Sequence, residues 1–296
     1  MNLQRLSVVA AALTIATSVN LLGVKSATAV ALTGLTDNNT LLLFDSATPR
    51  DVTRVRVTGA TGNLLGIDLR PANNLIYGLT DTNNIYTINP FSGAATLVST
   101  LSVPFTGGNF SGVDFNPVAD RLRVVGSNDQ NFRINVDTGA VIQDGLLNPG
   151  DPFIVAAAYT NSDTDPATST TLYTIDFASD QLFIQNPPNN GTQTLVGSLG
   201  VTTLEPLAGF DIVTANGVNT AFAALFTTDT RDSSLFNINL STGAATEIGR
   251  IGNGRRSIFG LTAAPKAVPE PATITGLAIV TAGLIASRRK LKKNSI

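Results

Sequence analysis

The sequence predicts an all-β fold, a β-propeller of about five four-stranded blades, and three observations support this prediction. A turn motif recurs along the chain at blade-length spacing. A Gly-x-Asp motif precedes the turn in most units. The 296 residues are rich in Thr, Asn, Gly, Leu and Val and contain no Trp, a composition that suits short strands joined by tight turns.

The recurring turn has the form Ile-Asn with a Gly four residues after the Asn. INPFSGAAT at 88–96 recurs as INVDTGA at 134–140 and INLSTGAAT at 238–246, and residues 184–195 hold a weaker copy. In three copies the Gly stands where a hairpin loop needs a positive φ. The turn positions are 44, 46, 51 and 53 residues apart, the length of propeller blades. They are Asp45, Asn89, Asn135, Asn186 and Asn239, and the glycines are Gly93, Gly139 and Gly243.

The Gly-x-Asp motif marks the strand that begins each unit. It stands at 66–69 (GIDL), 112–115 (GVDF) and 209–212 (GFDI), with a degenerate copy at 156–159 (AAAY). Each unit therefore contains four strands, and this leading strand is expected to lie closest to the propeller axis.

The first unit lacks its leading strand, because the segment after the N-terminal leader opens directly on the second one. Residues 257–261 (SIFGL) follow the last hairpin and have the character of the missing strand. We expect the two ends to share a blade and close the ring, which removes free sheet edges. An open solenoid is the alternative.

Residues 1–29 have the pattern of a signal peptide. Arg5 precedes an apolar stretch from 6 to 24, and Ala27-Thr28-Ala29 has the small-x-small form of a signal-peptidase site. Cleavage after Ala29 is expected. The alternative is an uncleaved N-terminal anchor.

Residues 266–296 have the parts of a sorting signal. Pro269, Glu270 and Pro271 precede an apolar run from 272 to 286, and a cluster of Arg and Lys follows. A helix continued to Leu291 would just span a membrane, with the basic tail in the cytoplasm and the propeller outside. The alternative is a plain C-terminal anchor.

This order of parts closely resembles the PEP-CTERM sorting signal of Gram-negative bacteria. The resemblance implies an exosortase substrate, held in the inner membrane by its C-terminal transmembrane helix until it is processed near Pro269 to Pro271. The protein would then reach the cell surface or the extracellular space. Signal peptidase and exosortase are the processing partners that follow from this.

Residues 31–262 resemble a bacterial family known as domain of unknown function 4394, on the GLTD motif at 34–37 and 78–81 and the two motifs above. The resemblance supports one exported propeller domain at 30–265 and implies no chemistry.

Charge and composition exclude several functions. All five Lys lie outside 30–265, where eleven Arg face twenty acidic residues, a net charge near −9. Such a domain does not attract nucleic acid. The absence of Cys and His excludes a Ser-His-Asp triad and imidazole or thiolate metal ligands. A polysaccharide, a cation or a surface protein is the expected ligand.

Asp68, Asp114 and Asp211 of the Gly-x-Asp motifs are the main candidate site residues, because innermost strands line the channel. Carboxylates there could act on glycosides as general acid and base, which leaves a glycosidase or lyase open. Repetition in several blades favours a structural role as acceptors for backbone amides of neighbouring blades. We therefore expect no catalytic residue.

No cofactor is expected, and calcium is the alternative. Asp163 and Asp165 stand in a loop that begins like an EF-hand, but Pro166 and Leu172 replace its required Gly and Glu, so solvated turns are favoured. Elsewhere, Arg70 and Arg133 are candidates for ion pairs with Asp, and Arg121 and Arg123 are expected to project to solvent from one strand face.

The sequence thus favours a non-enzymatic, exported binding or scaffold propeller of the cell surface or the extracellular matrix, among exopolysaccharides. The enzyme alternative is a carboxylate-dependent glycosidase or lyase acting in the channel.

Overall fold

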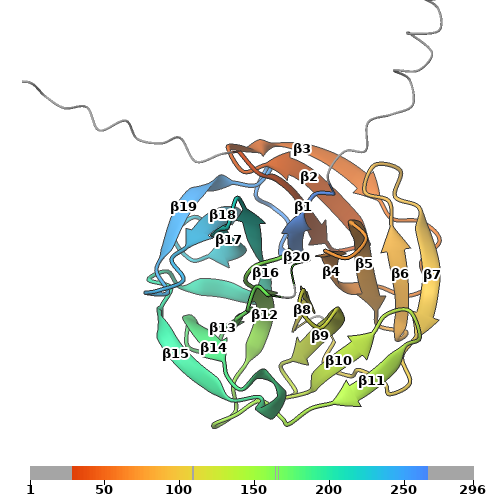
Figure 1. Ribbon diagram of the computed structural model, residues 1–296. Coiled ribbons are helices and arrows are strands. Elements are labelled where there is room, and N and C mark those ends of the chain that lie inside the picture. The colour runs from red at the N-terminus through yellow and green to blue at the C-terminus, as the bar shows by residue number, and fades with distance from the viewer. Residues whose placement is uncertain (1–28, 109, 164, 166, 266–296) are drawn as a thin grey trace, which may run out of the picture.

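Twenty strands form five antiparallel four-stranded sheets arranged around one axis (Figure 1) in the described part of the chain. The computed structural model describes residues 29–108, 110–163, 165 and 167–265. The predicted all-β propeller of five four-stranded blades is therefore confirmed.

Each of blades two to five is one continuous segment whose strands follow the chain from the axis outward. Blade two contains β4 (Leu64–Arg70), β5 (Leu75–Thr80), β6 (Asn84–Ile88) and β7 (Ala95–Thr100). Blade three contains β8 (Ser111–Asn116), β9 (Arg121–Gly126), β10 (Asn131–Asn135) and β11 (Ala140–Gln143). Blade four contains β12 (Ile154–Tyr159), β13 (Leu172–Asp176), β14 (Gln181–Gln185), the 3-10 turn η1 (Pro188–Asn190) and β15 (Gln193–Ser198). Blade five contains β16 (Thr203–Ala215), β17 (Val218–Thr227), β18 (Ser233–Ile238) and β19 (Ala245–Arg250).

Blade one joins the two ends of the domain. Its innermost strand is β20 (Ile258–Ala263), followed outward by β1 (Ala31–Thr36), β2 (Thr40–Asp45) and β3 (Thr48–Arg56). Strands β1 and β20 pair antiparallel, with Leu32 opposite Ala263 and Gly34 opposite Leu261. Figure 1 shows the blue C-terminal strand beside the red-orange N-terminal one. The expected ring closure is confirmed.

The Asn of the recurring turn holds the hairpins of blades two, three and five through its side chain. In blade two, Asn89 Oδ1 accepts the backbone N–H groups of Phe91 and Ser92. Gly93 has a φ of 75°, and a Cβ there would lie 2.1 Å from the carbonyl oxygen of Arg56 on blade one. The Gly therefore meets two requirements, a left-handed backbone and close approach of the neighbouring blade.

The glycine of the Gly-x-Asp motif lets inner strands approach each other. A Cβ on Gly112 would lie 2.4 Å from the backbone nitrogen of Ala157 on β12, and one on Gly66 would lie 2.5 Å from Val113 on β8. Real side chains do not fit at these distances. The motif's glycine is thus required by packing between blades rather than within one.

Apolar side chains fill the interfaces between blades. Between blades two and three, for example, Tyr77 packs edge-on against Phe115 with ring centroids 5.4 Å apart. The apolar cluster between blades three and four is smaller, and it is built around Ile154, Ala157 and Tyr159. A buried polar network replaces part of the core there.

Arg123 is the centre of that network, and the expectation that it projects to solvent is wrong. It is 1% exposed and donates to Asp144, Asn131 and Asn189 at 2.6 to 2.8 Å. Both faces of a propeller blade pack against neighbours, so strict alternation of buried and exposed residues does not apply to its inner strands. Arg133 forms an ion pair with the same Asp144, so the expected pairing of Arg133 with an Asp is confirmed.

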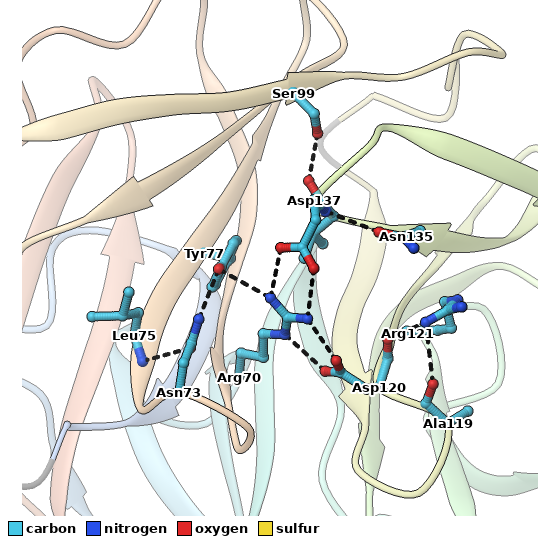
Figure 2. A network of polar contacts seen from close by, with 11 residues as sticks. Arg70, Asn73, Leu75, Tyr77, Ser99, Ala119, Asp120, Arg121, Asn135 and Asp137 are labelled. Carbon is cyan, nitrogen blue, oxygen red and sulfur yellow. Dashed lines mark hydrogen bonds and ion pairs between the residues drawn. The ribbon is translucent and has the colours of Figure 1, made fainter.

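Arg70 clamps blade two to blade three (Figure 2). From the end of β4 its guanidinium donates to Asp120, in the turn after β8, at 2.7 Å and to Asp137, in the hairpin after β10, at 2.8 Å. The Tyr77 hydroxyl accepts a further bond. These carboxylates raise the pKa of Arg70 and, in return, Arg70 lowers that of Asp120.

The predicted signal peptide with Ala27 and the sorting segment with Pro269, Glu270 and Pro271 lie outside the described residues. Ala29 is the first described residue. Within the described part of the chain, no helix has the length and hydropathy needed to cross a membrane.

Replacing Gly112 with Ala should lower the free energy of unfolding by about 1 to 3 kcal/mol, because the added methyl group overlaps the backbone of Ala157. Urea unfolding followed by circular dichroism measures this change. The matched control is Ala156→Gly, at the equivalent position of β12, which should cost no more than about 1 kcal/mol. Equal stability of Gly112→Ala and the unmodified protein would contradict the packing explanation.

Candidate functional site

The three aspartates of the Gly-x-Asp motifs meet at the propeller axis. Asp68 on β4, Asp114 on β8 and Asp211 on β16 each contribute a carboxylate oxygen, and these three atoms lie within 4.8 Å of one another. The residues are only 5%, 2% and 4% exposed. The structure therefore brings the sequence-predicted candidates together in one buried cluster, called the axial carboxylates below.

The other two blades place different residues at the equivalent position. In β12 it is Ala158, within the degenerate motif copy. In β20 it is Thr262, which follows Gly260 as the Asp follows the Gly elsewhere. The sequence search missed this residue, although Gly260-Leu261-Thr262 differs from the motif only by Thr in place of Asp. A ring of five positions thus carries three carboxyl groups and one hydroxyl group.

Each axial carboxylate accepts a backbone N–H from the next blade. The donors are Phe115 to Asp68 at 2.7 Å, Tyr159 to Asp114 at 3.1 Å and Ala263 to Asp211 at 2.6 Å. Every donor is the residue that follows the equivalent position of its own strand. The carboxylates therefore satisfy inner-strand amides that have no ladder partner toward the neighbouring blade.

Thr262 continues the same pattern with a hydroxyl group. Its Oγ1 accepts the N–H of Leu69 on β4 at 2.9 Å and donates to Asp68 Oδ1 at 2.9 Å. The expected role of the motif as an acceptor between blades is thus present at four of the five junctions. The junction after Ala158 has no side-chain acceptor at this position.

Burial raises the pKa of all three axial carboxyl groups. For Asp114, desolvation is the largest cause and the charges of Asp68 and Asp211 add to it. Desolvation and the charge of Asp211 raise the pKa of Asp68 against the effect of its hydrogen bonds. The pKa of Asp211 rises to about 6, again through burial, while amide donors lower it.

The axial carboxylates are the group of acidic residues with metal-ligand geometry in the described part of the chain. Their oxygen atoms suit a hard cation such as calcium, which would reduce the repulsion between the carboxylates. Protonation of the carboxyl groups reduces the same repulsion. The proposed calcium loop has no such geometry. Asp163 Oδ1 and Asp165 Oδ1 instead accept backbone N–H groups within the loop, as solvated turns do.

The axis has little free space among the inner-strand residues that precede the axial carboxylates. Its cavity holds about 10 Å³, the space of a single water, and it is lined by inner-strand residues such as Gly66, Ser111 and Ala157. Arg70 and Arg123 point away from it to partners between blades. The axial carboxylates thus lie in a packed, acidic part of the axis.

The fold and the axial ring define the class of protein as a five-bladed β-propeller closed by its own termini. A family profile described as domain of unknown function (DUF4394) matches residues 40–262, and the chain belongs to this family. No curated protein matches.

Two solved structures are similar to part of this chain at low sequence identity. A structural genomics protein of unknown function from Bacteroides thetaiotaomicron has a TM-score of 0.46 and 17% identity, over 73% of this chain and 58% of that one. An auxiliary nutrient binding protein from the same organism has a TM-score of 0.42 and 13% identity, over 79% of this chain and 63% of that one. The chain thus spans about three fifths of the length of either structure.

The raised pKa values predict that the protein becomes less stable as the pH rises from about 4 to 7. The native state binds more protons than the unfolded state between the unfolded pKa near 3.8 and the folded pKa, about 6 for Asp211, so stability is lost as pH rises through this window. Asp211→Asn should flatten the slope and raise stability at pH 8 by about 2 to 3 kcal/mol. Urea titrations at each pH, with a chelator present, measure the free energy of unfolding of both proteins.

The control for this pH dependence is Asp51→Asn on β3, an exposed aspartate, which should leave the slope unchanged. A stability that rises from about pH 4 to 7 in the unmodified protein would show that the axial groups are ionised and compensated in the native state.

Asp114→Ala should be less stable than Asp114→Asn by about 1 to 3 kcal/mol. Both changes remove the charge, but only Asn keeps an oxygen that can accept the N–H of Tyr159. Thermal unfolding of the two variants at one pH isolates this hydrogen bond. Identical melting temperatures would mean that the carboxylate does not serve as an acceptor between blades.

Proposed function

We propose that this protein is an exported, non-enzymatic binding or scaffold propeller of the cell surface or extracellular matrix. The observation that carries this proposal is the packed axis. Asp68, Asp114 and Asp211 are buried, and each accepts a backbone N–H of the neighbouring blade. The three aspartates, which are the candidate catalytic residues, therefore connect neighbouring blades of the ring.

The alternative, a glycosidase or lyase acting in the channel, fits this geometry poorly. Distance alone does not exclude it, because retaining glycosidases hold two carboxyl groups about 5 Å apart. Burial argues against it, because a sugar ring must lie between the acids, whereas these residues are only 2% to 5% exposed and one oxygen of each lies within 4.8 Å of the others. The outer surfaces of the blades remain accessible to a ligand.

The net charge of the domain supports the kind of partner that we propose, and the patterns at the two ends of the sequence support export to the cell surface. The domain from 30 to 265 has a net charge near −9 and no Lys, which suits an uncharged polysaccharide or a surface protein and not nucleic acid. The pattern ending in Ala27 and Ala29 supports export. The Pro269-Glu270-Pro271 pattern with its apolar run and basic tail supports transient membrane attachment and processing by an exosortase.

Replacing Pro269, Glu270 and Pro271 together by Ala should keep the protein in the membrane fraction. The apolar run and basic tail remain, so membrane insertion is preserved while the processing motif is lost. Fractionation and immunoblotting of cells that express the full-length chain measure the distribution. The control is the same number of Ala substitutions at Asn294, Ser295 and Ile296, beyond the basic cluster.

Release of the triple variant to the surface at the normal level would contradict exosortase processing. The same preparations serve to test the enzyme alternative. We expect no turnover of polysaccharides by the full-length protein, whereas turnover that Asp114→Asn abolishes would overturn the non-enzymatic proposal.

A further inference from the structure

A cleft on blade four differs in kind from the packed axis. It has a volume of about 330 Å³ and is open to solvent. One wall is the segment that leads into β12, with Pro149, Asp151 and Pro152, and the other includes Gln181 and Phe183 of β14. Ligand sites in proteins begin at about 300 Å³, so one or two sugar rings fit here.

Two polar side chains of the cleft have no partner within the described residues. Neither the Gln181 amide nor the Asp151 carboxylate makes a side-chain hydrogen bond or ion pair there. By contrast, Asp176 in the same lining is satisfied, because it accepts bonds from the backbone N–H of Phe153 and from Ser179. The cleft thus offers a free amide, which donates and accepts, and a free carboxylate, which accepts.

Phe183 adds an apolar surface next to these polar groups. Its side chain is only half-buried and lines the cleft. An aromatic ring beside an amide and a carboxylate matches a ligand whose rings carry both C–H faces and hydroxyl groups. Pro149 and Pro152 restrict the backbone of the opposite wall, so less conformational entropy is lost when a ligand is bound.

The charge of the cleft excludes anionic ligands. None of its lining residues is Lys or Arg. Asp151 also lies close enough to Asp129 to help raise the pKa of that carboxyl, after burial as the main cause. A uronate or phosphate group would meet like charges without a counter-ion.

We propose that the cleft between the segment before β12 and strand β14 binds a neutral saccharide, with Gln181 and Asp151 contacting its hydroxyl groups and Phe183 its ring face. This inference rests on the proposed function as a binding propeller and assigns that function a site and a ligand class. The axial carboxylates take no part in it.

The test is calorimetric titration of the full-length protein with neutral tetrasaccharides of glucose, galactose, mannose and xylose. We expect at least one of them to bind and an oligomer of glucuronic acid not to bind. Gln181→Ala and Phe183→Ala should each weaken that binding by about tenfold or more. Gln181→Ala is the clearer test, because the half-buried Phe183 also contributes to packing. Both variants must show the same thermal unfolding as the unmodified protein.

Matched controls come from other blades. Gln143→Ala, at an exposed glutamine of β11, and Phe91→Ala, in the exposed hairpin after β6, should leave binding unchanged. Binding that survives Gln181→Ala and Phe183→Ala alike would overturn the assignment of the cleft and leave the binding function intact.

Absence of binding to every neutral tetrasaccharide would overturn the ligand class. The proposed function is tested separately, by adding the full-length protein to cell-surface material and measuring the fraction retained. Retention without saccharide binding rejects this inference alone, and loss of both rejects the binding function as well.

Discussion

The close approach of five inner strands at the propeller axis is the constraint on which the rest of the structure depends. Where strands of neighbouring blades pass this near to each other, a Cβ on Gly66 or Gly112 has no space. The same proximity turns inner-strand amides toward the neighbouring blade, where Asp68, Asp114, Asp211 and the Thr262 hydroxyl accept them. Gly and Asp in the motif therefore have one geometric cause, the close approach of neighbouring inner strands. The Gly has no side chain to clash, and the Asp supplies an acceptor for the facing amide.

This solution has an electrostatic cost. Three carboxyl groups that serve three different junctions are brought to one point, where burial and mutual repulsion raise their pKa values. Perturbed pKa values commonly mark functional sites, but structural networks perturb them as well. Here each axial carboxylate accepts a backbone N–H of the next blade, which supports a structural cause for the raised pKa values.

The repeats made the fold predictable, because each motif is imposed by a contact that recurs in most blades. Asn89 with Gly93, and Gly112 with Asp114, could be recognised from spacing alone. Features that occur once could not. The burial of Arg123 depends on what blade four presents to it, and the cleft at Gln181 depends on the route of the segment before β12. Neither the Arg123 network nor the cleft repeats from blade to blade, so the periodicity of the sequence could not predict them.

The same distinction indicates where function lies in this protein. Residues repeated in most blades serve the ring, so a ligand site is expected where one blade departs from the repeat. Blade four departs most: its inner strand has Ala156 and Ala158 in place of Gly and Asp, and its junction with blade three has a small apolar cluster. The cleft lies on this blade, with Gln181 and Asp151, whose side chains have no partner among the residues that the structure describes. Relaxation of the structural motif and the presence of free polar groups thus coincide at one position in the ring, away from the axis.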